Sequence, residues 1–231
     1  MSDDGAGDGD IPAEFVTFKY PLPHLAAALL GKDPPRIVAM GSSSTAGRED
    51  VVPYPARLEM YLRRAYNNPR IDVINRGVGG QEADDEVGRF NDDIFPEPPP
   101  LVIWQVGTNA VFQNRDIDKV ATKIAEGLAR LREQPLDVVM MDPQYVPAML
   151  GDKAEASDRI VSIIAAAAEK AGVSVFRRWA LMRHWHVHNN IPLDRMIDPT
   201  DDAKLHQSDW STQRVSVALS EAISKAPAAV T

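Results

Sequence analysis

Five short apolar segments recur along the chain, and the intervals between them leave room for helices. They span residues 36–41, 71–75, 101–107, 136–142 and 173–177. Most are apolar on both faces, which is typical of strands in a parallel sheet that helices cover on both sides. This alternation of strands and helices places the chain in the α/β class.

The intervening segments show the spacing of amphipathic helices. The clearest carries Ile117, Val120 and Ile124 at spacings of three and four, and Asp116 is placed to cap its first turn. Further helices are predicted at residues 58–65, 154–171 and about 211–225. Gly172 fits a left-handed C-cap for the second of these. We therefore predict a three-layer α/β/α sandwich with a flavodoxin-like five-stranded parallel sheet in the order 2-1-3-4-5.

Composition narrows the range of functions. The 231 residues are 44% hydrophobic and 25% charged, which suits one α/β domain over residues 14–231. Residues 1–13 have too little apolar content to pack and are predicted to be a flexible tail. The net charge of -8 repels phosphate backbones and argues against nucleic-acid binding. The absence of cysteine excludes disulfides, a thiolate nucleophile and cysteine-based metal sites.

Nothing in the sequence indicates a membrane segment or a cofactor. The N-terminus lacks the basic and apolar parts of a secretory signal, so we expect a soluble protein. Its compartment stays open, because a signal could have been removed from a precursor, and the oligomeric state is not readable. Residues 41–47 depart from the spacing of a Walker phosphate loop, so they do not predict a nucleotide site. Glu82 occupies the third glycine position of a dinucleotide fingerprint, which argues against that motif as well.

Glycine, serine and asparagine gather in the loops that leave the first three strands. These loops span residues 41–47, 75–80 and 107–110. Each loop taken alone is ordinary turn chemistry. In the predicted strand order, however, all three meet at the carboxyl edge of the sheet, where a nucleophile and oxyanion donors can converge on one carbonyl. A fourth candidate, His206, precedes the last predicted helix at the same edge and can face Ser43 as a general base.

Over residues 36–219, these features resemble the SGNH, or GDSL-like, hydrolases. That family shows Gly-Asp-Ser-x-Thr near the N-terminus, an isolated glycine, a Gly-x-Asn-Asp block and Asp-x-x-His near the C-terminus. The resemblance implies that Ser43 is the nucleophile and His206 the base. It further implies an oxyanion hole made by the backbone N–H groups of Ser43 and Gly80 and by the Asn109 amide.

Two departures concern the first and third blocks. Ser42 stands where the family often has Asp, and Ala110 stands where the third block often has its second Asp. Neither position carries the proton transfer, so we interpret both as subfamily features. Thr45 separates the chain from the larger α/β-hydrolases, whose nucleophile lies in Gly-x-Ser-x-Gly.

The third departure concerns the acidic partner of His206. Asp-x-x-His requires a carboxylate at the position of Ala203. We expect a slightly longer turn that lets Asp202 orient the imidazole, with Asp201 as the fallback. The alternative is a Ser-His dyad in which these residues and the nearby Asp198 are solvated turn residues.

The resemblance implies a serine esterase that works without a cofactor through an acyl-enzyme. No long apolar lid is apparent, which favours short-chain or acetyl esters of small molecules or saccharides. The connection between residues 177 and 204 is expected to wall the acyl or alcohol pocket with Trp179, Met182 and Trp185.

Two other functions stay open. His184, His186 and His188 form a His-x-His-x-His run that could bind a transition metal in a metal-dependent hydrolase. A non-catalytic carbohydrate-binding relative of the same fold would explain the displaced Asp.

Overall fold

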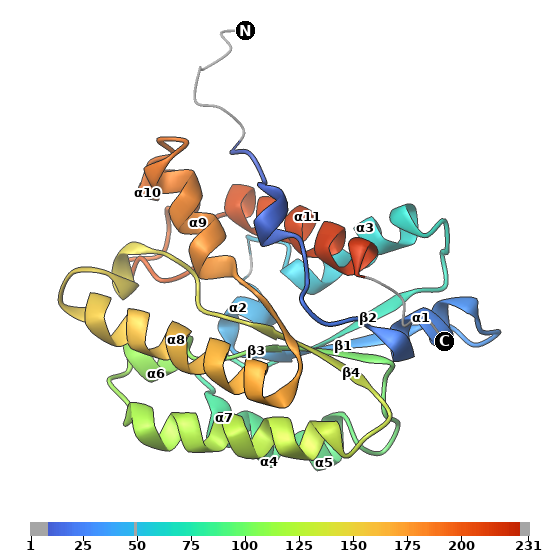
Figure 1. Cartoon of the computed structure of the whole chain (residues 1–231). Helices are drawn as coiled ribbons and strands as arrows, with labels where there is room; N and C mark the ends of the chain where they lie inside the picture. The colour runs from blue at the N-terminus through green and yellow to red at the C-terminus, as the bar shows by residue number, and fades with distance from the viewer. Residues whose placement is uncertain (1–8, 49, 227–231) are drawn as a thin grey trace, which may run out of the picture.

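A parallel five-stranded sheet forms the centre of the computed structural model, which describes residues 9–48 and 50–226 (Figure 1). Its strands are β1 (Arg36–Gly41), β2 (Asp72–Gly77), β3 (Leu101–Gln105), β4 (Asp137–Met141) and β5 (Ser174–Phe176). The order is β2-β1-β3-β4-β5 with parallel neighbours throughout, so the predicted flavodoxin-like order is confirmed. The strands β3 and β4 are buried along their whole length, as the apolar runs predicted.

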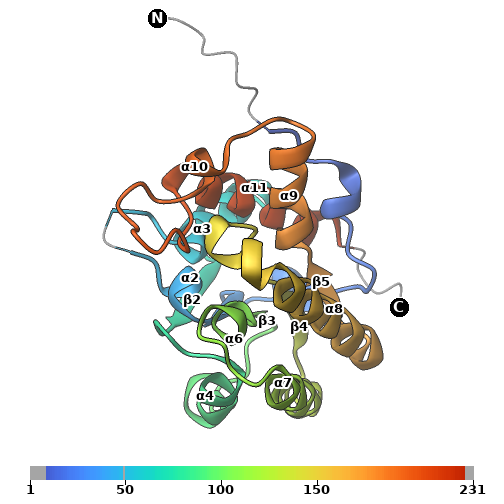
Figure 2. The ribbon, with the colours of Figure 1, turned by 90° about the vertical axis from the view of Figure 1, so that its left-hand side faces the viewer.

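Helices cover both faces of this sheet. They are α1 (Pro23–Leu30), α2 (Ser43–Ala46), α3 (Tyr54–Ala65), α4 (Ala83–Gly88), α5 (Phe90–Asp93), α6 (Thr108–Phe112), α7 (Ile117–Arg132), α8 (Ala154–Ala171), α9 (Arg178–Val187), α10 (Leu193–Met196) and α11 (Asp209–Lys225), with 3₁₀ turns η1 (Ala13–Phe15), η2 (Pro147–Met149) and η3 (Gly151–Lys153). Figures 1 and 2 show α3 and α11 on one face, and α4, α7 and α8 on the other. The predicted three-layer sandwich is therefore confirmed. Within the described residues, no helix has both the length and the apolar character that crossing a membrane would need.

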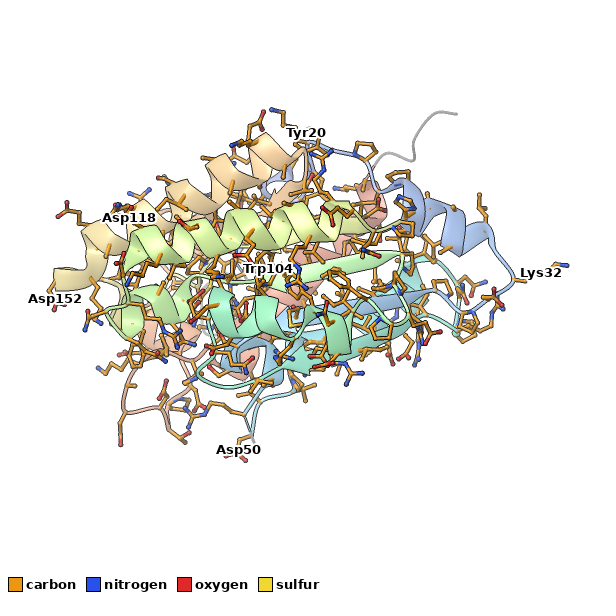
Figure 3. The ribbon with its side chains drawn as sticks, turned by 90° about the horizontal axis from the view of Figure 1, so that it is seen from below. Tyr20, Lys32, Asp50, Trp104, Asp118 and Asp152 are labelled. Carbon is orange, nitrogen blue, oxygen red and sulfur yellow. The ribbon has the colours of Figure 1, made fainter. Side chains whose placement is uncertain are left out.

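Trp104 of β3 fixes the distance between the sheet and α7. Its side chain is fully buried. A Cβ built on Gly127 of α7 would lie 2.4 Å from Cη2 of Trp104, so glycine is needed for this close approach. Figure 3 shows Trp104 where α4 and α7 cover the sheet.

The long helices follow the predicted capping. Asp116 accepts hydrogen bonds from the backbone N–H groups of Asp118 and Lys119 at the start of α7. Gly172, with φ of 67°, ends α8 in the left-handed conformation. The last helix begins two residues before its predicted start, because the Ser208 side chain caps it by accepting the Ser211 N–H.

Residues 178–187 differ from the prediction, since this part of the expected connection forms α9. Leu181, Met182 and Trp185 are fully buried at helical spacing. Trp179 is also buried and packs edge-on against Tyr145. These side chains therefore belong to the core.

The N-terminal segment already contacts the rest of the protein at Gly9, before the predicted start of the domain at residue 14. Of the predicted tail, residues 1–8 lie outside the described residues. From Gly9 onwards the chain contacts the helical layer: the Trp185 indole N–H donates to the Asp10 carbonyl at 2.8 Å, and Arg214 of α11 donates to the Gly9 carbonyl. His184 lies 2.9 Å from the Asp10 carboxylate. These polar contacts compensate for the low apolar content of residues 9–13.

Candidate active site

Ser43 lies at the carboxyl end of β1, as the first residue of the short helix α2. Figure 2 looks onto this edge of the sheet, where α2 and α6 face the viewer. The end of β2 passes so close to α2 that a Cβ on Gly77 would lie 2.1 Å from the backbone nitrogen of Ala46. A Cβ on Gly79 would lie 3.9 Å from the Ser43 Cβ, so the loop after β2 runs directly beside the serine.

His206 reaches Ser43 from a connection 163 residues further along the chain. Its Nε2 lies 3.0 Å from the Ser43 Oγ. The connection is held by an antiparallel bridge between Ile197 and Gln207 and by the Asp198 N–H, which donates to the His206 carbonyl at 2.9 Å. The structure therefore brings the predicted nucleophile and base within hydrogen-bond distance.

The carboxylate at the imidazole belongs to Asp201, and the expectation of Asp202 was wrong. Asp201 Oδ2 lies 2.8 Å from His206 Nδ1, and it accepts the backbone N–H groups of Leu205 and His206 at 2.9 and 2.7 Å. A turn explains the choice: the Lys204 N–H donates to the Asp201 carbonyl, and Lys204 has a φ of 51°. This reversal returns the chain to Asp201 and leaves Asp202 exposed at the tip of the turn.

Asp201 is held in its charged form. Burial raises its pKa, but the hydrogen bonds from the backbone and side chain of His206 and from the Leu205 N–H lower the pKa to about 2. Arg48 Nη1 lies 3.1 Å from the second oxygen, and Arg48 also pairs with Asp198 at 3.5 Å. The charged carboxylate favours the tautomer in which Nδ1–H donates to Asp201, which leaves Nε2 free to accept the serine proton. In that tautomer the 3.1 Å approach of Arg48 to Nδ1 is a contact between two donors.

Asn109 and Gly80 lie on the other side of Ser43. Asn109 is buried at the start of α6, and its Nδ2 donates to the Gln81 carbonyl at 2.8 Å. This bond uses one of the two amide hydrogens and leaves the second available. Gly80 has a φ of 80°. Its neighbour Gly79 lies beside Ser43, and its other neighbour, Gln81, accepts the hydrogen bond from Asn109. The loop after β2 thus runs from beside Ser43 to a hydrogen bond with Asn109.

Gln144 joins the loops of the site and was not predicted. Its Oε1 accepts from Ser44 Oγ at 3.2 Å, Thr108 Oγ1 at 3.1 Å and Arg178 Nη2 at 2.8 Å. Its Nε2 donates to the Leu205 carbonyl at 3.1 Å. Ser44, Thr108 and Leu205 are the sequence neighbours of the predicted nucleophile, amide donor and base. One fully buried side chain therefore ties together the backbone around all three.

Gln105 has a similar role beneath the first loop. Its Oε1 accepts the Ser42 N–H and Oγ, each at 3.1 Å, and the Thr45 Oγ1 at 3.2 Å. Ser42, which replaces the family Asp, is thereby used to anchor the loop. A polar side chain within or just after an apolar strand is the signal that could have identified Gln105 and Gln144.

The His-x-His-x-His run does not converge on one point. His184 and His186 lie on α9 and His188 is its C-cap residue; the His184 and His188 rings are tilted with their centroids 5.0 Å apart. His186 Nδ1 is 2.9 Å from the Ile191 carbonyl, and its ring faces Tyr145. Residues two apart point to different sides of a helix, unlike on a strand. No group of three or more metal-ligating side chains is placed to hold an ion in the part of the chain that the structure describes.

A cavity of about 20 Å³ lies beside Ser43 and His206. Gly47, Arg48, Pro53 and Thr212 line it together with the two site residues. Trp179, Met182 and Trp185, which were expected to wall the pocket, are not among the lining residues, because α9 turns their side chains into the core. This volume is about that of one water molecule, and neither Gly80 nor Asn109 lines it.

Other proteins of known structure share this fold. An acetylxylan esterase from Geobacillus stearothermophilus has a similar structure, with a TM-score of 0.72 and 16% identity over 83% of this chain and 94% of the esterase. A putative lipolytic protein of the G-D-S-L family from Desulfitobacterium hafniense gives a TM-score of 0.63 and 17% identity over 81% and 98% of the two chains. Both similarities show a shared fold.

An uncharacterized lipoprotein of Bacillus subtilis is 32% identical over 75 residues, which are 32% of this chain and 31% of that protein. The model of the Non-GDSL lipase-like family matches residues 8–229. Its description agrees with the Ser42 departure from Gly-Asp-Ser. Because the match spans nearly the whole chain, the protein belongs to the Non-GDSL lipase-like family.

Proposed function

We propose that the protein is a serine esterase in which Ser43, His206 and Asp201 form the catalytic triad. The distance of 3.0 Å between Ser43 Oγ and His206 Nε2 carries the proposal. The contact of Asp201 with Nδ1 supports it, because a base oriented by a third group is the arrangement that activates a serine hydroxyl. The fold shared with an acetylxylan esterase adds support.

The proposed reaction has two steps. His206 takes the Ser43 proton as Oγ attacks the ester carbonyl, and then gives it to the leaving alcohol. Water repeats the sequence on the acyl-enzyme, releasing the acid and regenerating the serine. In each step the carbonyl oxygen gains negative charge, and the backbone N–H groups of Ser43 and Gly80 with the Asn109 amide stabilise it.

The proposed substrates are short-chain esters, acetyl esters above all, on a small alcohol or a saccharide. The fold shared with an acetylxylan esterase supports acetyl esters as the substrate class. Trp179, Met182 and Trp185 of α9, which were expected to wall the pocket, are packed in the core.

Ester hydrolysis by the full chain is the direct test. We expect p-nitrophenyl acetate to be cleaved, butyrate more slowly and longer esters least, with acetylated saccharides assayed in parallel. Ser43→Ala should lower kcat by about a million-fold, because the nucleophile is lost. A fluorophosphonate probe should label Ser43, as located by mass spectrometry.

The outcomes separate the proposal from its alternatives. A chain that binds acetylated saccharides but neither cleaves esters nor reacts with the probe would be a carbohydrate-binding relative. Activity that survives Ser43→Ala but is abolished by a chelator would indicate a metal-dependent hydrolase.

A further inference from the structure

A buried carboxylate, that of Glu82, caps two helices at once beneath the loop that carries Asn109. Its Oε1 accepts the N–H groups of Ala83 at 3.1 Å and Gly107 at 2.8 Å, and its Oε2 accepts the Ala110 N–H at 2.6 Å. The first contact lies at the start of α4, and the other two lie at the start of α6. Glu82 is 1% exposed, so these bonds are shielded from water.

The helix α6 cannot supply its own cap. Its N-cap residue is Gly107, with a φ of 94°, and a Cβ there would lie 2.9 Å from Ile164 Cδ1. Glycine is therefore required at a position where a Ser or Asp would normally bond the free N–H groups. Ala110 stands where the Gly-x-Asn-Asp block of the SGNH hydrolases has its Asp, so this residue supplies no carboxylate either. The carboxylate that the start of α6 lacks comes instead from Glu82, 28 residues earlier.

Asn109 lies in the sequence between Gly107 and Ala110, the two residues of the α6 start whose N–H groups Glu82 accepts. Gln81, the residue before Glu82, accepts the Asn109 Nδ2–H at 2.8 Å. Two consecutive residues of the second loop thus hold the backbone on either side of Asn109 and its side-chain amide. We propose that Glu82 is a positioning residue that aims the Asn109 amide at the developing oxyanion. The role rests on the proposed esterase function.

A second buried glutamate one turn further along α4 provides a matched control. Glu86 Oε2 accepts the Trp104 indole N–H at 2.7 Å, and its Oε1 has no hydrogen-bond partner among the described residues. Burial, and then the charge of Glu82, raise the pKa of Glu86 well above its usual range. Burial also raises the pKa of Glu82, but the three backbone N–H groups oppose that rise. We assign the proton to Glu86 and the charge to Glu82, so Glu86→Gln replaces a neutral acid by a neutral amide of the same shape.

Three variants isolate the role of Glu82. Glu82→Gln keeps the size but turns one acceptor into a donor that faces a backbone N–H. Glu82→Asp keeps the charge and a favoured N-cap for α4, but it is one methylene too short to reach both N–H groups of α6. Asn109→Ala removes the amide itself, with an expected loss of about 100- to 1,000-fold in kcat.

The test measures kcat and KM on p-nitrophenyl acetate with the full chain, alongside thermal unfolding. Glu82→Asp and Glu82→Gln should each lower kcat by about 10- to 100-fold with KM changed less than about threefold, since misplacing a donor affects the transition state. Glu86→Gln should stay within about twofold of wild type. In the Asn109→Ala background, Glu82→Asp should add less than about a threefold further loss.

Each other outcome overturns the role. Wild-type kcat in Glu82→Asp, or losses that multiply in the double variant, would show that Glu82 does not act through Asn109. An equal loss in Glu86→Gln would reveal a general effect of disturbing the buried pair. If Glu82→Gln fails to fold, Glu82→Asp decides alone. A wild-type chain that hydrolyses no ester would instead overturn the proposed function itself, and the role with it.

Discussion

At the scale of single residues, the site differs from the family pattern in how it holds His206. The carboxylate lies five positions before the histidine, and the turn closed by Lys204 absorbs the extra residues. The sequence predicts Ser43 and Asn109 because their loops follow strands that can be recognised. It could not choose between Asp201 and Asp202, because that choice depends on a left-handed residue at Lys204 that no periodicity reveals.

Neighbouring aspartates allow this difference to be tested. Asp201→Asn should lower kcat by about 100- to 10,000-fold, since an amide can stabilise the wrong imidazole tautomer and cannot balance the imidazolium charge. Asp202→Asn should stay within about twofold of wild type, because this side chain is exposed. Both are measured on p-nitrophenyl acetate at one pH. A larger loss in Asp202→Asn would contradict the assigned triad.

At the scale of elements, the long helices and the strands were predictable and the short helices were not. The helices α7 and α8 have clear apolar periodicity and recognisable caps. By contrast, α2 and α6 span only 4 and 5 residues, too short to show periodicity. Tertiary contacts hold them instead, through Gln105 beneath α2 and Glu82 at the start of α6. The position of Gln144 after an apolar strand marks it as a candidate, but its partners Ser44, Thr108 and Leu205 are distant in the sequence and only the tertiary structure identifies them.

Substitution of Gln144 should disturb several elements together. Gln144→Leu removes the acceptor shared by Ser44, Thr108 and Arg178 and the donor to the Leu205 carbonyl, so kcat should fall about 100-fold and the melting temperature should drop. Gln144→Glu keeps an acceptor beside the buried Arg178 and loses only the bond to Leu205. We expect it to retain the wild-type melting temperature with about a tenfold loss of kcat. Wild-type kinetics in Gln144→Leu would contradict the proposed coupling of the loops.

At the scale of the whole molecule, a buried acid links stability to pH. Burial raises the pKa of Asp142 from 3.8 to about 7, although the Trp179 N–H and the Arg178 charge act in the opposite direction. The folded protein therefore binds a proton that the unfolded chain releases above about pH 4. Asp142 thus makes the free energy of unfolding fall as the pH rises from about 4 to about 7.

Replacing the acid by its amide should remove this dependence. Asp142→Asn keeps an oxygen that can accept the Trp179 N–H, which Asp142 accepts at 2.8 Å. Urea unfolding at pH 5 and pH 8 should show that wild type loses about 2 kcal/mol more than the variant between these values. The other buried acids are common to both proteins and cancel in the comparison. Parallel pH profiles would show that Asp142 has an ordinary pKa.

The distance along the chain between Ser43 and His206 has a consequence for synthesis. A chain emerging from the ribosome completes the first strand and its serine long before residue 206 is made. Until the connection before α11 has docked, the hydroxyl lacks its proton acceptor and is no more reactive than an ordinary alcohol. The proposed hydrolytic activity thus requires the finished tertiary structure, and a fragment that ends before His206 should lack it.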